Sequence, residues 1–118
     1  MAARQIVLDT ETTGLQARMG DRVIEIGCIE LLGRSVSERH FHSYVNPERG
    51  IDEGAAKVHG LTADFLADKP KFAEIAKEFV EYVSGAELII HNAAFDVEFI
   101  DQELSLIGLK KITEYCPS

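Results

Sequence analysis

The segment that most constrains the fold lies near the N-terminus, where residues 6–14 read Ile-Val-Leu-Asp-Thr-Glu-Thr-Thr-Gly. An apolar run of this kind predicts a buried β-strand over residues 5–10, and the run ends in two acidic residues, Asp9 and Glu11. Side chains two positions apart on a strand point the same way. We therefore expect two carboxylates side by side at the end of a buried strand.

Two neighbouring carboxylates in such a place need a partner. They repel each other and lose hydration, so a proton, a basic group or a cation must lie between them. The sequence has no lysine or arginine between Arg4 and Arg18, which leaves a divalent cation as the natural partner. Oxygen ligands favour Mg²⁺ or Mn²⁺ over Zn²⁺. The segment thus predicts a metal site.

Length and composition set the class of protein. With 118 residues and a hydrophobic fraction of 46%, the chain fits one globular domain or part of one. No apolar run approaches the length of a membrane span. The net charge of −8 argues against a protein that grips nucleic acid by its own basic surface. A nucleic-acid enzyme that uses metal ions stays open, with a partner supplying the long-range attraction.

The cysteines and the N-terminus indicate the cellular compartment of the protein. Cys28 and Cys116 show no metal-binding spacing, so we interpret them as ordinary core and surface residues. Free thiols fit a reducing cytoplasm. Residues 1–5 lead directly into the first strand, so we expect no signal peptide and a cytoplasmic protein.

The remaining periodicity predicts an alternating arrangement of strands and helices. A second strand and a third, the latter with Val36, Phe41 and Tyr44 packing, should form a hairpin around Gly33. A loop-rich segment follows, with Thr62 capping a short helical turn. The other expected elements, in chain order, are strands over 23–31 and 36–45, loops over 46–71, a helix over 72–83 ended by Gly85, a strand over 88–90 and a helix over 93–106 capped by Asn92.

This order predicts an α/β protein with a mixed sheet flanked by helices. Sites in such sheets lie beyond the carboxyl ends of the strands. A second acidic segment follows the short strand at 88–90, where residues 91–99 read His-Asn-Ala-Ala-Phe-Asp-Val-Glu-Phe. Asp96 lies one turn into the helix and can face Asp9 and Glu11 if the two strands are neighbours. Phe95 beside it offers an aromatic face on which a base could stack.

At this point two motifs resemble those of a known family. Asp-Thr-Glu-Thr-Thr-Gly at 9–14 and His-Asn-Ala-Ala-Phe-Asp at 91–96 resemble the first two motifs of the DEDD-type 3′–5′ exonucleases. The likeness covers essentially the whole chain, including Val-His-Gly-Leu-Thr at 58–62, and is closest to proofreading exonucleases of the bacterial DNA polymerase III type. It implies a ribonuclease-H-like fold, a single-stranded or frayed DNA 3′ end as substrate, and a polymerase catalytic subunit as partner.

The resemblance also implies roles for individual residues. Asp9 and Glu11 would hold two Mg²⁺ or Mn²⁺ ions, and Asp96 would support the second ion. A second set of residues would contact the terminal nucleotide, His59 through a phosphate or sugar. This set is Asp9, Thr10, Glu11, Thr12, Gly14, Leu15, His59, Asn92 and Phe95. Asn92 and His59 also have structural readings, as a helix cap and a turn residue.

The sequence departs from the family in two respects. The smaller is Gly54, with Glu53 one place away, at a position where the family usually carries an acidic residue shortly before Val-His-Gly. The third family motif, His-x-x-x-x-Asp on a later helix, supplies the general base and a further metal ligand. His59 and Asp64 have this spacing but fall in the loop-rich segment, and His91 and Asp96 already belong to the second motif. We therefore expect residues 1–118 to be the N-terminal portion of one exonuclease domain, C-terminally incomplete, with impaired cleavage.

Two other functions remain open. A non-catalytic module could bind a polymerase subunit or a nucleotide through the apolar surface that the missing helix would leave. Self-association through the same surface is one form of this. An RNA-directed exonuclease of the same superfamily would share both motifs.

Overall fold

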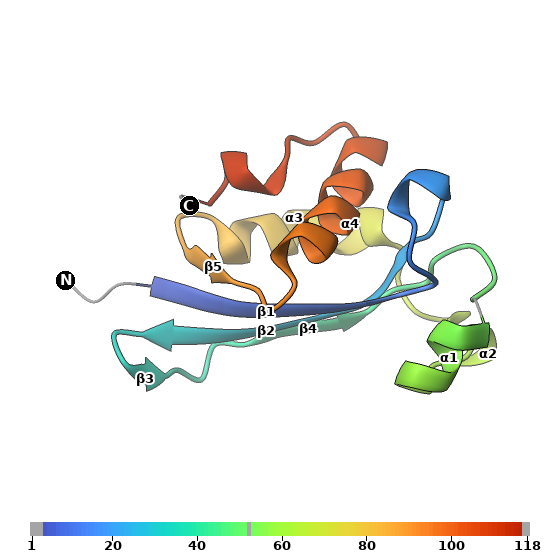
Figure 1. Ribbon diagram of the computed structural model, residues 1–118. Coiled ribbons are helices and arrows are strands. Elements are labelled where there is room, and N and C mark those ends of the chain that lie inside the picture. Colours follow the sequence, from blue (N-terminus) through green and yellow to red (C-terminus); the bar gives the residue numbers. More distant parts are fainter. Residues whose placement is uncertain (1–3, 52, 117–118) are drawn as a thin grey trace.

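A mixed β-sheet with helices packed on one face forms the body of the molecule (Figure 1). The computed structural model describes residues 4–51 and 53–116. Helices α3, α4 and the η2 turn cover the sheet, whereas α1 and α2 lie together at one end. In chain order the elements are β1 (Arg4–Thr12), η1 (Ala17–Met19), β2 (Val23–Leu32), β3 (Ser35–Val36), β4 (Phe41–Tyr44), α1 (Glu53–His59), α2 (Ala63–Leu66), α3 (Phe72–Val83), β5 (Glu87–Ile89), α4 (Ala93–Leu106) and η2 (Ile112–Glu114).

Strand β1 lies between β2 and β5. The sheet order is β3-β2-β1-β5, with β4 also paired to β2. β1 runs antiparallel to β2, and parallel to β5 with Val7 opposite Ile89. The predicted α/β class and mixed sheet are therefore confirmed, and the strand carrying the first acidic motif is the neighbour of the strand that leads to the second.

The two faces of β1 differ in their surroundings. Ile6, Leu8 and Thr10 are buried against the helices, whereas Val7 and Asp9 are exposed on the opposite face. We call this second face the open face. Its apolar members include a row across three strands, because Val7 pairs with both Ile29 and Ile89. In the part of the chain that the structure describes, these side chains stay partly exposed.

Helix α3 shows why the apolar periodicity predicts the core well. Its buried stripe is Phe72, Ile75, Ala76, Phe79, Tyr82 and Val83, which is the spacing expected for one helical face. Phe79 packs against Phe41 of β4 and Phe72 of the same helix, with ring centroids 5.7 and 6.3 Å apart. The helix ends at Val83, and Gly85 then adopts a φ of 81° that favours glycine.

Several sequence predictions need correction. The third strand, predicted over 36–45, is split into β3 and β4, and Val36 is 64% exposed rather than packed. Helix α1 lies inside the segment predicted as loops. Asn92 occupies the N-cap position of α4, but its side chain makes no capping hydrogen bond. Cys28 and Cys116 are both buried and free, so neither is a surface residue.

Two buried carboxylates tie the layers together on the covered side of the sheet. Glu103 of α4 accepts two hydrogen bonds from the Arg22 guanidinium, at 2.8 and 2.6 Å, and one from the Val23 backbone N–H at 2.9 Å. Glu30 of β2 accepts from Arg4 and from the Ser37 hydroxyl. Within the described ranges, no helix is long and apolar enough to cross a membrane.

Candidate active site

The three predicted acidic residues gather around the end of β1. Asp9 and Glu11 project from the open face, Asp9 exposed and Glu11 half-buried. Asp96, in the first turn of α4, is only 4% exposed. The Thr10 hydroxyl donates a 2.7 Å hydrogen bond to Oδ1 of Asp96, which fixes that carboxylate against β1. The parallel pairing of β1 with β5 thus brings the two motifs together, although the exposed Asp9 contradicts the predicted burial of both carboxylates.

The electrostatics show that these carboxylates sense one another. The pKa of Glu11 is raised by burial and then by the negative charge of Asp9; His59 opposes this increase, and Glu25 and Asp96 add smaller increases. Burial also raises the pKa of Asp96, against the Thr10 hydrogen bond, and Asp9 adds to the increase. When they are ionised, both carboxylates therefore lack enough nearby positive charge to balance their own.

The same arrangement defines what could occupy the site. Among the ion pairs of the described residues, none involves Asp9, Glu11 or Asp96. Within residues 4–51 and 53–116, no three acidic, histidine or cysteine side chains already converge in a metal-binding arrangement. An all-oxygen donor set is nevertheless chemically suited to a hard divalent cation.

A cavity of about 440 Å³ opens beside the acids. Its lining combines polar groups at the end of β1 with apolar side chains from the following loop, α1 and α4. Leu15 and Val58 are 80% and 84% exposed, which leaves apolar surface free for a flat ligand. The lining residues are Thr10, Glu11, Thr12, Gly14, Leu15, Gly54, Ala55, Val58, His59 and Phe95.

The cavity unites most of the residues that the family resemblance assigns to the terminal nucleotide. Seven of them line it, whereas Asp9 and Asn92 do not. Asp9 instead borders a smaller hollow on the open face, and Asn92 is exposed before α4. Gly54, Ala55 and Val58 are the lining residues that the sequence analysis missed. They belong, with His59, to α1, a segment that the sequence predicted as loops, and only the motif at 58–62 pointed to it.

His59 occupies the cavity wall in a fixed orientation. Its Nδ1 accepts a 3.0 Å hydrogen bond from the Leu61 backbone N–H, and its Nε2 lies 3.2 Å from the Thr12 carbonyl oxygen. This pattern corresponds to a proton on Nε2 that is donated to Thr12. A phosphate or sugar contact through His59 would therefore have to replace one of these two bonds.

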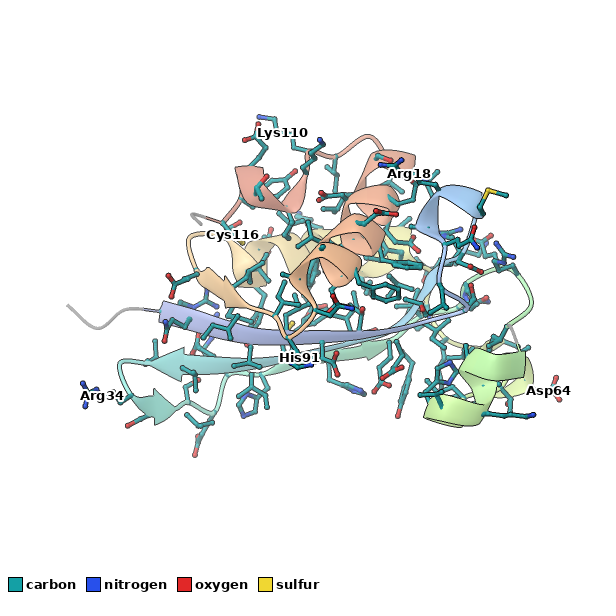
Figure 2. All side chains as sticks on the ribbon, viewed as in Figure 1. Arg18, Arg34, Asp64, His91, Lys110 and Cys116 are labelled. Atoms are coloured by element: carbon teal, nitrogen blue, oxygen red, sulfur yellow. The ribbon has the colours of Figure 1, made fainter. Side chains whose placement is uncertain are left out.

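The His59–Asp64 spacing, which mimics the third motif, does not form a pair at the site. Figure 2 shows Asp64 projecting outward from α2, and its side chain is exposed. Asp64 therefore does not join His59 in a metal-binding pair. His91 lies near Asp96 closely enough to lower its pKa, the smallest of the effects on that carboxyl group.

The sequence and the fold of this chain match those of a family of nucleases. The family model described as exonuclease matches residues 6–117, so this chain belongs to the exonuclease family. Two curated relatives carry a more specific name. The DNA polymerase III subunit epsilon of Rickettsia felis is 51% identical over 109 residues, which is 92% of this chain and 48% of the relative. That of Escherichia coli K12 is 49% identical over 119 residues, covering 96% and 49%.

Solved structures agree with this assignment. Exonuclease X in complex with 5′ overhanging duplex DNA is 28% identical, with a TM-score of 0.68, over 80% of this chain and 52% of that chain. A product-bound exonuclease I superposes with a TM-score of 0.83 over 96% of this chain and 28% of that chain, and at 18% identity it supports the fold alone. The ribonuclease-H-like fold is thereby confirmed. The chain spans about half the length of the curated relatives it matches.

Proposed function

We propose that this chain is part of a 3′–5′ exonuclease domain that removes the terminal nucleotide of a DNA strand in proofreading. The single observation that carries the proposal is that Asp96 is tied to Thr10 of β1, between Asp9 and Glu11 on the same strand, next to a cavity of about 440 Å³ that Glu11 lines. The epsilon subunits among its relatives support the DNA substrate. Such a reaction needs acidic groups beside the phosphodiester and an apolar wall against which the terminal base can pack.

Divalent cations complete the proposed site. Asp9, Glu11 and Asp96 would hold two ions, Mg²⁺ or Mn²⁺, which would supply charge stabilisation to the attacking and leaving oxygens of the phosphodiester. The raised pKa values of Glu11 and Asp96 support this, because each carboxylate gains from a positive neighbour. Leu15, Val58 and Phe95 would orient the terminal base by apolar contact.

The hydroxyl of Thr10 gives a first test of the metal site. Replacing Thr10 by valine removes the 2.7 Å hydrogen bond that orients Asp96. Groups that orient metal ligands usually contribute about tenfold or more to affinity, so we expect Mn²⁺ to bind about tenfold more weakly to Thr10→Val. Free Mn²⁺ measured by electron paramagnetic resonance during a titration reports this constant.

A matched control is available on the surface. Thr113→Val in η2 makes the same chemical change away from the acids and should leave Mn²⁺ binding unaltered. Equal Mn²⁺ affinities for wild type and Thr10→Val would contradict the role of Asp96 as a metal ligand.

Nuclease activity is tested on the 118-residue chain itself. With a 5′-labelled single strand and Mn²⁺, we expect a ladder of products shortened from the 3′ end, formed slowly because the chain carries no third motif. Asp9→Ala should reduce the rate by about a hundredfold or more, because it removes charge stabilisation at the reacting phosphate. The control Asp64→Ala alters an exposed acid of α2 that lies outside the site.

Each outcome of that assay decides one alternative. Cleavage that is unaffected by Asp9→Ala would contradict the proposed site, and faster cleavage of an RNA strand of the same sequence would favour an RNA-directed enzyme. A rate typical of proofreading enzymes would refute the expected impairment. No cleavage by the wild type would overturn the proposal and favour the non-catalytic module.

We further propose a polymerase catalytic subunit as partner and the cytoplasm as location. The names of the relatives support the partner, and the two free cysteines support a reducing compartment. The open face, with its row of Ile29, Val7 and Ile89, favours the second candidate function, a binding module that contacts such a subunit or a second copy of the chain. Light scattering after size exclusion, alone and with a polymerase subunit, distinguishes these states; a monomer that binds no subunit counts against the module.

A further inference from the structure

An exposed row of aromatic side chains begins next to the acids on the open face. In the sheet register, Asp9 lies opposite Gly27 and Gly27 opposite His42, while Glu11, Glu25 and Tyr44 form the next row. Cross-strand partners share one face of a sheet. His42 and Tyr44 of β4 therefore lie on the same face as the carboxylates, two strand spacings or about 10 Å away.

The row continues onto helix α2. The rings of His42 and Tyr44 meet edge to face at 4.9 Å between centroids, and Tyr44 and Phe65 meet in the same way at 4.9 Å. Lys69 places its Nζ 4.6 Å from the centroid of the Phe65 ring. We call His42, Tyr44, Phe65 and Lys69 the aromatic strip.

Much of the strip faces solvent. Phe65 is 41% exposed, and the His42 side chain is about half exposed. The ring contacts also help to pack α2 on β4. That packing alone does not explain why the outer surfaces of the rings stay exposed. Exposed aromatic faces with a lysine ammonium beside them are the combination that binds single-stranded nucleic acid, through base stacking and phosphate attraction.

The surface between the acids and the strip is hollowed. A cavity of about 100 Å³ is lined by Asp9, Thr10, Glu11, Glu25 and Gly27. Gly27 has no side chain, and a Cβ placed there would meet nothing within 4 Å. The Glu25 carboxylate is held 2.6 Å from Nε2 of His42. Gly27 therefore presents no side chain to a strand that runs from the acids to the strip.

We propose that the aromatic strip binds the nucleotides that precede the 3′-terminal nucleotide of a single-stranded DNA substrate. This inference rests on the proposed function, which places the terminal nucleotide in the cavity beside Glu11 and Phe95. That cavity holds the terminal nucleotide, and the aromatic strip holds the nucleotides upstream of it. Chains longer than one nucleotide should then bind more tightly than a mononucleotide.

Binding measurements separate the two sites. The probes are thymidine 5′-monophosphate and an eight-nucleotide oligothymidylate with phosphorothioate linkages that resist cleavage, both titrated with Mn²⁺ present. One stacked base contributes about 1 to 3 kcal/mol, which corresponds to a change of roughly 5- to 150-fold in affinity. We expect Phe65→Ala to weaken binding of the octamer at least about fivefold and to leave binding of the mononucleotide unchanged.

A second variant and a control variant distinguish a specific loss of binding from an effect of misfolding. Lys69→Glu changes a charge rather than a packed ring and should also weaken the octamer selectively. Leu106→Ala removes an exposed apolar side chain at the C-terminal end of α4 and should change neither constant. Circular dichroism confirms that all three variants are folded.

Different results would contradict the role of the aromatic strip and the proposed function. Unchanged octamer affinity in both Phe65→Ala and Lys69→Glu, or a wild type that binds octamer no more tightly than mononucleotide, would overturn the strip and leave the cavity assignment intact. A wild type that binds neither probe and cleaves no strand would overturn both.

Discussion

Replacing Glu103 by alanine is expected to lower the free energy of unfolding by about 3 to 5 kcal/mol, the range observed when one partner of a buried ion pair is removed. Glu103 is almost completely buried on α4 and accepts three hydrogen bonds, two from Arg22 and one from the Val23 backbone N–H. The variant leaves the N–H and most of the guanidinium without a partner. Urea denaturation followed by circular dichroism measures the change.

Two variants show whether the hydrogen bonds account for the effect. Glu98→Ala removes an exposed acid from the same helix and should change stability by no more than about 0.5 kcal/mol. Glu103→Gln keeps an acceptor and should fall between the other two. A loss below about 1 kcal/mol for Glu103→Ala would mean that solvent replaces the bonds to Arg22 at little cost.

Replacing Glu30 by glutamine is expected to destabilise the protein at neutral pH and to flatten its response to acid. Glu30 is buried, and its pKa is lowered by the hydrogen bond from Ser37 and then by that from Arg4. A carboxyl group whose pKa is lowered in the folded state stabilises the fold above its unfolded pKa, near 4.3. That contribution is lost as the pH falls through the lower, folded value.

The measurement is the difference in unfolding free energy between wild type and Glu30→Gln across pH. We expect the difference to be largest and constant from about pH 5.5 to pH 7, and to shrink as the pH falls below about 4.3, where the unfolded carboxyl group becomes protonated. Glu38→Gln, at an exposed position, should show no such dependence. A difference that stays constant down to pH 2 would contradict the lowered pKa of Glu30.

Most of the fold followed from local patterns because those patterns dominate where a segment is long or strongly periodic. The buried stripe of α3 fits only the spacing of a helix, and the apolar run of β1 fits only a strand. Val36 and helix α1 were predicted wrongly for the opposite reason. The stretch from Ser35 to Tyr44 alternates weakly, and only the register of β2 decides that it forms two short strands. α1 contains Gly54 and few apolar residues, so its helical signal is weak.

The sequence suggests candidate members of the site but not their geometry. Asp9 and Glu11 were proposed because they stand at the end of an apolar strand, and Asp96 because it follows a second strand, positions with a known role in α/β folds. The exposure of Asp9 could not be foreseen, because the open face of the sheet depends on which helices cover it. The tie between Thr10 and Asp96 and the double anchoring of His59 arise from tertiary contacts alone. The same holds for the aromatic strip, whose members come from β4, α2 and the segment after it.

The parallel pairing of β1 with β5 has a consequence for the order of folding. Its partners are about eighty residues apart in the chain, and contacts of such high sequence separation form slowly because loop closure must precede them. The contact of Asp96 with Thr10 of β1 also spans 86 residues, so a nascent chain lacks a complete set of acids until α4 has been synthesised and docked. Ions that require all three carboxylates would then act after the folding transition state, slowing unfolding while leaving the refolding rate unchanged.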